Sequence, residues 1–144
     1  MRTGKRWAAI TGLATMAASA GLLLGTSPAS ADINCKSGYH CVFYAGLYDS
    51  ARHSYFNNDT DFRNDTFNEL TGRYGAGQTV HNNTWSFSNS STSGYESHYY
   101  TGIGSDWGGH LLCVEPGSEV NSVHPDLRNR ASSLRLMKNS GNCY

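Results

Sequence analysis

The six histidines are the residues of this sequence best suited to move protons or to bind a metal ion, because imidazole changes charge near neutral pH. They are scattered along the chain, at His40, His53, His81, His98, His110 and His124. No GxSxG or HExxH string accompanies them, so neither a nucleophile elbow nor a zinc-peptidase helix is indicated. We therefore predict no catalytic residues and expect His53 and His110, which hold similar places in two similar segments, to be polar strand positions.

One acidic cluster, NNDTDFRNDTFNE at positions 57–69, offers Asp59, Asp61 and Asp65 as oxygen ligands for calcium. The cluster does not fit an EF-hand loop, because Arg63 occupies the fifth position and no glycine stands at the bend. A solvated loop is the favoured interpretation. The sequence predicts no cofactor.

The cysteines are the second group with chemical potential: Cys35, Cys41, Cys113 and Cys143. An even number of cysteines in an exported chain indicates disulfides. Three connectivities are possible. One of them, Cys35 with Cys41 and Cys113 with Cys143, would close a small loop and tie the C-terminus to a strand. A four-cysteine metal site is disfavoured, because no close pair of zinc-ligand type occurs.

The first 31 residues predict a secretory signal peptide. Arg2, Lys5 and Arg6 precede an apolar run that ends in small residues and Ala29–Ala31. A membrane anchor is the less favoured alternative, because polar residues interrupt the run and a cleavage pattern follows it. We expect residues 1–31 to be removed and residues 32–144 to form one secreted, extracellular domain that is a monomer and has no membrane segment.

Composition narrows the classes of partner. Removal of the three leader cations leaves eight Lys and Arg against eleven Asp and Glu, a net charge of −3. No basic surface for nucleic acid is therefore predicted. Nine tyrosines, sixteen glycines and polar segments rich in Asn, Ser and Thr favour strands and turns.

Two similar segments would position the residues above. YAGLYDSARHSYF at 44–56 and YTGIGSDWGGHLLC at 100–113 each have the residue types of a strand, a turn and a second strand. Their matching positions are Tyr44 with Tyr100, Gly46 with Gly102, Asp49 with Asp106, and His53 with His110. Each segment is followed by an Asn and Ser motif, NNTWSFSNSS at 82–91 and RNRASSLRLM at 128–137. Placing Asn83 on Asn129 puts Ser86 on Ser132.

These motifs resemble the two Greek keys of the βγ-crystallin fold. CKSGYHCVFYAGLYDSARHSYF followed by LRNRASSLRLM is similar to the secreted bacterial peptidase-inhibitor family built on that fold, the inhibitor family numbered thirty-six, typified by an actinobacterial metalloproteinase inhibitor. The resemblance implies an all-β sandwich of two Greek-key motifs, stapled by disulfides. The first hairpin departs from the pattern, since Ser50 or Ala51 stands where a glycine belongs, whereas Gly108 or Gly109 fits in the second.

The resemblance also implies a calcium motif of two adjacent Asn or Asp residues, two further residues, Ser or Thr, and Ser. Asn82, Asn83 and Ser86 meet most of it, but Phe87 stands in place of the last serine. In the second copy, Asn129, Ser132 and Ser133 fit, whereas Arg128 places a cation where a ligand belongs. We expect one weak site near Asn82 and Asn83 at most.

The leading functional expectation, implied by the resemblance, is a secreted inhibitor of an extracellular peptidase, with zinc endopeptidases as the expected target class. It would present an exposed loop in an extended, pre-organised form. The reactive site is unknown; residues 71–78 and the region near Cys113 are the candidates, although an ordinary hairpin connection is the favoured role of each. The alternative is a non-enzymatic extracellular binding or antimicrobial, killer-toxin-like module that uses Trp85, Trp107 or the tyrosines for stacking. Burial of the aromatic side chains is favoured over that use. A hydrolase with dispersed residues is the third reading.

Overall fold

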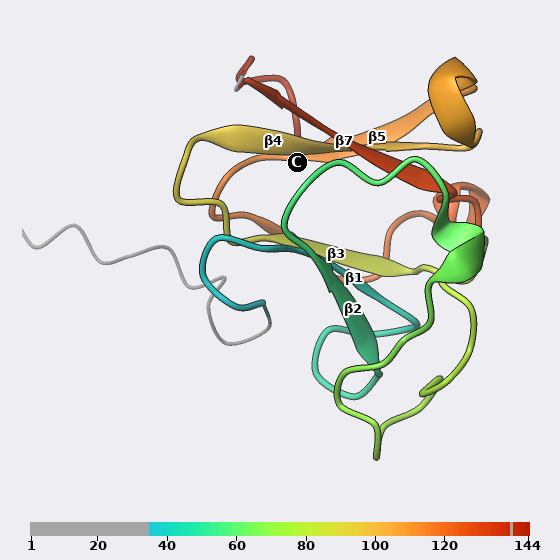
Figure 1. Cartoon of the computed structure of the whole chain (residues 1–144). Helices are drawn as coiled ribbons and strands as arrows, with labels where there is room; N and C mark the ends of the chain where they lie inside the picture. Colours follow the sequence, from blue (N-terminus) through green and yellow to red (C-terminus); the bar gives the residue numbers. More distant parts are fainter. Residues whose placement is uncertain (1–34, 139) are drawn as a thin grey trace, which may run out of the picture.

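Two antiparallel sheets form the protein (Figure 1). The structure, a computed structural model, describes residues 35–138 and 140–144, so the predicted signal peptide lies outside the described residues. The first sheet has the strand order β2-β1-β3-β6, with β1 at His40–Phe43, β2 at Arg52–Tyr55, β3 at Ser86–Asn89 and β6 at Glu119–Val120. The second has the order β5-β4-β7, with β4 at Tyr95–Tyr100, β5 at His110–Val114 and β7 at Ser133–Lys138.

Helical structure in the described part of the chain consists of short 3-10 turns. They are η2 at Phe62–Asn64, η3 at Gly104–Asp106 and η4 at Pro125–Leu127. Within residues 35–138 and 140–144, no helix is long and apolar enough to cross a bilayer. The expected all-β class is confirmed.

Each half of the chain lends a segment to the sheet of the other half. Strand β6 belongs to the second half, yet it pairs with β3, with Phe87 opposite Val120. In return, Asp59 of the first half makes an antiparallel bridge to Leu134 of β7. This exchange is what two interlocked Greek keys require, so the predicted βγ-crystallin-like sandwich is confirmed.

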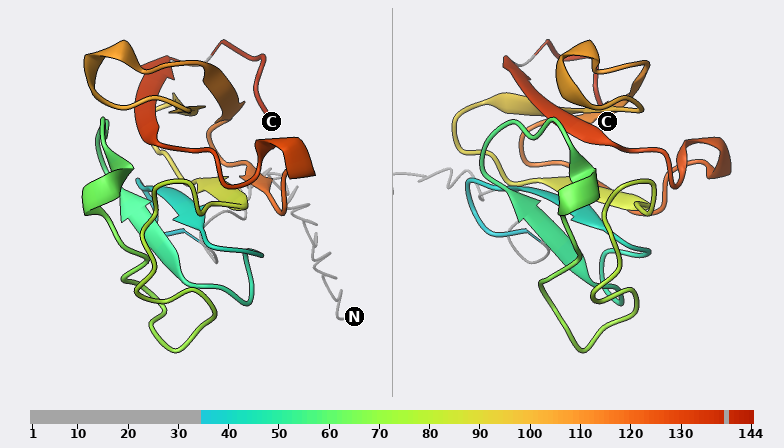
Figure 2. Two further views of the ribbon diagram at one scale, coloured as in Figure 1. Left: turned by 90° about the vertical axis from the view of Figure 1, so that its right-hand side faces the viewer. Right: turned by 45° about the vertical axis from the view of Figure 1, so that its right-hand side comes forward.

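The core lies between the two sheets, which face each other as layers in Figures 1 and 2. Alternation along the strands points one set of side chains inward, and Phe87 of β3 meets Tyr99 of β4 with ring centroids 4.4 Å apart. The segment between β2 and β3 adds Phe62 and Phe67, both fully buried. Tyr55 stacks on Phe62 at 4.8 Å.

Both disulfides are present, and no cysteine is free. Of the three connectivities that the sequence leaves open, the structure has Cys35 with Cys41 and Cys113 with Cys143. The second bridge fastens the C-terminal segment beside β5. Such bridges are typical of proteins that fold in an oxidising compartment.

The expected match of Ser86 with Ser132 is wrong by one residue. Ser86 Oγ donates to the Ala45 carbonyl, and Ser133 Oγ donates in the same way to the Gly102 carbonyl. Each of these serines therefore ties the start of a strand to the folded hairpin of its own half.

The backbone around two asparagines confirms the corrected match. Asn82 and Asn129 both have a φ of 56°. The Asn82 amide donates to Ala131 O, and the Asn129 amide donates to Thr84 O. Because these two hydrogen bonds are reciprocal, Asn82 corresponds to Asn129 and Ser86 to Ser133.

The bends of the two hairpins are stabilised in different ways. In the first, Ser50 Oγ accepts from the Ala45 amide and donates to Gly46 O. In the second, Gly108 has a φ of +65°, and a Cβ there would lie 2.6 Å from the Gly102 nitrogen, so only glycine fits. A serine side chain thus replaces the close backbone contact that the second half obtains from glycine.

Candidate functional site

Two neighbouring loops carry the most exposed aromatic residues beside the first sheet. Tyr74, between β2 and β3, is 68% exposed, and Tyr48, between β1 and β2, is 65% exposed. Arg73 connects the two loops, because its guanidinium donates to Tyr48 O at 2.9 Å. We name this group, Tyr48, Arg73 and Tyr74, the loop patch. The loop between β2 and β3, drawn from green to yellow-green in Figure 1, extends past the ends of the strands.

The loop is held by hydrogen bonds although its tip is exposed. The Ala51 amide donates to Tyr74 O at 2.9 Å, which bonds the loop to the first hairpin. At its base, the Phe67 amide donates to Gln78 O at 2.9 Å and the Gly77 amide donates to Phe67 O at 3.0 Å. Such bonds fix the backbone before any partner binds and reduce the entropy that binding would cost.

The ring of Tyr44 supports the loop from below. It meets Tyr74 edge-on, with centroids 4.9 Å apart, and Phe67 at 5.6 Å. A Cβ on Gly75 would lie 2.0 Å from the Tyr44 ring, and Gly75 has a φ of +84°. Only glycine can therefore occupy position 75, and the exposed Tyr74 ring is packed on one side.

Residues 71–78 do not have the extended form that the reactive loop of an inhibitor would need. Hydrogen bonds from the Arg73 amide to Leu70 O, from Ala76 to Arg73 O and from Gln78 to Gly75 O make a series of tight turns. The glycines in TGRYGAGQ permit these turns, since Gly75 and Gly77 both have positive φ. The segment therefore presents side chains at its surface instead of an extended backbone.

A groove of about 550 Å³ forms a second candidate surface. Its aromatic members are Phe56, which is 62% exposed, and Tyr95, which is 38% exposed. The remaining lining residues are Gly38, His40, Asn57, Asn58, Thr92, Ser93 and Leu136. Aromatic rings beside amides and hydroxyls can stack on and hydrogen-bond to a polar ligand.

The aromatic side chains are less buried than expected. Trp85 and Trp107 are only partly buried, and four tyrosines, Tyr48, Tyr74, Tyr95 and Tyr144, are exposed. The phenylalanines, apart from Phe56, supply the core. The exposed tyrosines of the loop patch and the groove therefore lie at the surface and do not contribute to the core.

The candidate calcium ligands point to different partners. Asn82 Oδ1 accepts from Ser132 Oγ at 3.1 Å, Asn83 donates to Thr79 O, and the Ser86 hydroxyl is buried on Ala45 O. With Ser86 at the last position of the motif, His81 and Asn82 fill its first two positions. No carboxylate stands in this copy of the motif.

The second copy is blocked by a cation and an indole. With Ser133 at the last position, Arg128 is the first residue of the motif, and its guanidinium lies over the Trp85 ring, 4.8 Å from the centroid. Trp85 Nε1 donates to Asn129 Oδ1 at 2.9 Å. The Asn129 side-chain oxygen is therefore already bonded to a donor, and Arg128 adds a positive charge to this copy of the motif.

The aspartates of the acidic cluster form hydrogen bonds and an ion pair with other residues of the protein. Asp61 makes a two-pronged ion pair with Arg63, which holds the pKa of Asp61 low, at about 2. Asp59 accepts from the Asp61 amide, and Asp65 accepts from the Tyr55 hydroxyl at 2.9 Å. Within the described ranges, some sets of three possible metal ligands have atoms within 4.8 Å of one another. None of these aspartates belongs to such a set.

One buried serine and histidine pair bears on the hydrolase reading. Ser97 Oγ of β4 and His40 Nδ1 of β1 are 2.6 Å apart and link the two sheets. Burial lowers the pKa of His40 from 6.5 to about 4, so the ring is neutral at pH 7. Ser97 is fully buried, so its hydroxyl cannot reach a substrate and the pair is an internal connection.

The other histidines lie apart, with one exception. His53 Nδ1 bonds to Thr66 O on the first sheet, His81 lies beside Asn82, and His124 caps η4. His98 and His110 are in contact on the second sheet, with ring nitrogens 3.2 Å apart. His53 and His110 were expected to hold equivalent positions in the two segments, but they have different hydrogen-bond partners.

Comparison with known proteins finds two structures of limited similarity. No protein-family model and no curated protein matches this chain. Among solved structures, the N-terminal domain of Protein S shares 19% identity over 69% of this chain and 96% of its own, with a TM-score of 0.44. A βγ-crystallin domain from Flavobacterium johnsoniae shares 16% identity over 72% of this chain and 98% of its own, with a TM-score of 0.46. Similarities of this size carry no statement about function.

Proposed function

We propose that this protein is an extracellular binding module that acts as a peptidase inhibitor and docks through the loop patch. The observation that carries the proposal is a hydrogen-bonded loop with the exposed Tyr74, which Arg73 connects to the loop of the exposed Tyr48. Tyrosine and arginine are enriched among the residues that dominate binding energy at protein interfaces. The disulfides and the hydrogen-bonded loop base favour resistance to cleavage, which an inhibitor needs.

The target class follows from the motif resemblance described above, which favours a secreted zinc endopeptidase. Because the backbone of this loop is not extended, the loop would not lie in the active-site cleft of the peptidase as a substrate does. Its side chains would instead cover the mouth of that cleft. Binding then needs little ordering of the loop, and Tyr74 supplies a large, rigid contact area.

The first test titrates purified secreted protein against a zinc endopeptidase, a serine peptidase and a cysteine peptidase. We expect stoichiometric loss of activity with one class, and Tyr74→Ala should weaken inhibition by at least about tenfold. Tyr95→Ala, an exposed tyrosine at the groove, is the matched control and should inhibit normally. Digestion at many bonds, or no inhibition of any class at micromolar concentration, would refute the inhibitor proposal.

The groove supports a second candidate, a module that binds an extracellular glycan. Phe56 and Tyr95 are exposed beside Asn57, Asn58 and Ser93, and aromatic rings with neighbouring amides suit sugar rings. In this case Tyr95→Ala would abolish retention on insoluble cell-wall polysaccharide and Tyr74→Ala would not. The same two variants therefore separate the two functions.

A further inference from the structure

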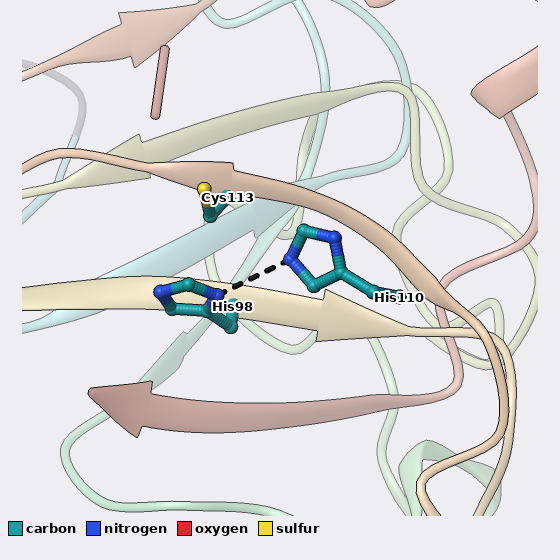
Figure 3. A group of neighbouring side chains, drawn as sticks. All are labelled: His98, His110 and Cys113. Carbon is teal, nitrogen blue, oxygen red and sulfur yellow. Dashed lines mark hydrogen bonds between the residues drawn. The ribbon is translucent and has the colours of Figure 1, made fainter. Parts of the chain in front are cut away.

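Two histidines meet on the outer face of the second sheet, next to the Cys113–Cys143 bridge (Figure 3). His98 lies in β4 directly opposite Cys113, and His110 begins β5. The register of the two strands shifts between Tyr99 and Tyr100. The shift pairs His110 with Tyr100 and leaves the His110 ring 5.3 Å from the His98 ring.

A buried carboxylate holds His98 from the opposite side. Glu96 is fully buried, and its Oε2 lies 2.8 Å from His98 Nε2. The Ser140 and Gly141 amides donate to the other carboxyl oxygen of Glu96, so this group acts as an acceptor. Glu96 Oε2 accepts the Nε2 proton of His98, so Nδ1 presents its lone pair toward His110.

We propose that His98 Nδ1 and His110 Nε2 bind a divalent transition-metal ion of the zinc, nickel or copper class. The two nitrogens are 3.2 Å apart. Two imidazoles bound at about 2.0–2.1 Å with a near-tetrahedral angle need a separation of roughly 3.3 Å. Glu96 would support His98 as carboxylates commonly support metal-binding histidines, by fixing the tautomer and the ring orientation.

Ion binding replaces the hydrogen bond between the two rings. The proton on His110 Nε2 transfers through solvent to His110 Nδ1, which frees the Nε2 lone pair, and the net proton count of the protein does not change. The sulfur of Cys113 lies within 4.8 Å of a ring nitrogen of each histidine, but it is part of a disulfide and is not a thiolate. The ion therefore has two protein ligands.

Room for further ligands lies beside His110. A hollow of about 300 Å³ is lined by His110, Cys113, Asn142, Cys143 and Tyr144 with two leucines. Water can fill the remaining positions of the ion there. Arg135, opposite His98 on β7, brings one positive charge nearby, but its guanidinium lies toward the Trp107 ring, 5.9 Å from the centroid.

The test is a calorimetric titration of the secreted protein, disulfides intact, with zinc chloride. We expect one ion per chain, and His98→Ala and His110→Ala should each weaken zinc binding by at least about tenfold. His124→Ala, which removes an exposed histidine at η4, is the matched control and should leave the affinity unchanged. An unchanged affinity in His110→Ala, or equal losses in all three variants, would overturn the proposal.

A second measurement needs no variant and so remains decisive if His98→Ala does not fold. Addition of nickel or copper ions to isotope-labelled protein broadens the amide signals near the bound ion. We expect broadening centred on His98 and His110. Broadening centred on His53, His81 or His124, or none up to millimolar metal, would overturn the assignment.

Discussion

His40 shows how one buried residue can govern the pH response of the whole fold. Its ring is 2% exposed, and burial lowers its pKa from 6.5 to about 4. Protonation therefore favours the unfolded state, in which the ring is solvated. The resulting stability is fully present above about pH 6.5 and is lost as the pH falls from there toward 4.

We predict that this loss is on the order of 3 kcal/mol. His40→Asn keeps an amide near Ser97 but does not titrate. The difference in free energy of unfolding between wild type and variant, measured by urea denaturation, should shrink steadily from pH 7 to pH 4. Because other groups titrate in both proteins, the difference isolates His40, and parallel curves would contradict the assignment.

Asn82 and Asn129 occupy corresponding positions but should respond differently to an added charge. We predict weak calcium binding at most in the wild type. Asn82→Asp adds a carboxylate beside Ser132 Oγ and should raise the affinity for calcium, whereas Asn129→Asp should not, because Arg128 neutralises it. Calorimetric titration of the three proteins tests this, and two tight sites in the wild type would contradict it.

At the scale of elements, two adjacent serines at the start of β7 have different roles. Ser133 Oγ donates to Gly102 O at 2.7 Å and is fully buried. Ser132 Oγ donates to Asn82 Oδ1, whose residue is exposed to water. Both serines are fully buried. Removal of the Ser133 hydroxyl takes a donor from the backbone of the hairpin, whereas the Asn82 side chain that Ser132 contacts is exposed and can bond to water instead.

We predict that Ser133→Ala lowers the free energy of unfolding by about 1–3 kcal/mol. Ser132→Ala, one residue away, is the control and should cost less. Chemical denaturation of both variants provides the measurement. The reverse order of the two losses would restore the match of Ser86 with Ser132 that the sequence first suggests.

The sequence alone allowed Ser86 to match either Ser132 or Ser133, because pairs of identical residues stand at both ends of the motif. Asn82 and Asn83 stand in the first copy, and Ser132 and Ser133 in the second. Either member of a doublet fits by residue type, and only the buried hydrogen bonds distinguish them. The strand, turn and strand pattern of the hairpins was predictable, because aromatic, β-branched and glycine residues alternate as strands and bends require.

The contact of His98 with His110 was not predicted. The two histidines stand on either side of one hairpin, which is the signal that was available. Simple pairing places Cys113 opposite His98, and the register shift that brings His110 close depends on the long turn between the strands. The exposure of Tyr48 and Tyr74 was also missed, because tyrosine content alone does not say which rings face the core.

At the scale of the whole molecule, the two disulfides should contribute unequally. Cys113 and Cys143 are 30 positions apart, and Cys35 and Cys41 are 6 apart. In the loop-entropy model the longer loop is worth roughly 4 kcal/mol and the shorter roughly 2 kcal/mol. The double variant Cys113→Ser with Cys143→Ser should therefore lower the thermal midpoint more than the variant that lacks the first bridge.

Export is a further whole-molecule prediction. We expect cleavage after Ala31, so that the secreted chain begins at Asp32 and labels with no thiol reagent until it is reduced. Intact mass spectrometry with and without reductant measures both. A different first residue, or labelling before reduction, would contradict the prediction.

The exchange of β6 and the Asp59 segment between the two halves has a consequence for the origin of the chain. A precursor with one motif would have left β3 with an unpaired edge, which only a strand from elsewhere could cover. A second copy of the same precursor offers such a strand, and the exchange then works in both directions. The present protein therefore has the architecture expected of two fused copies of one motif.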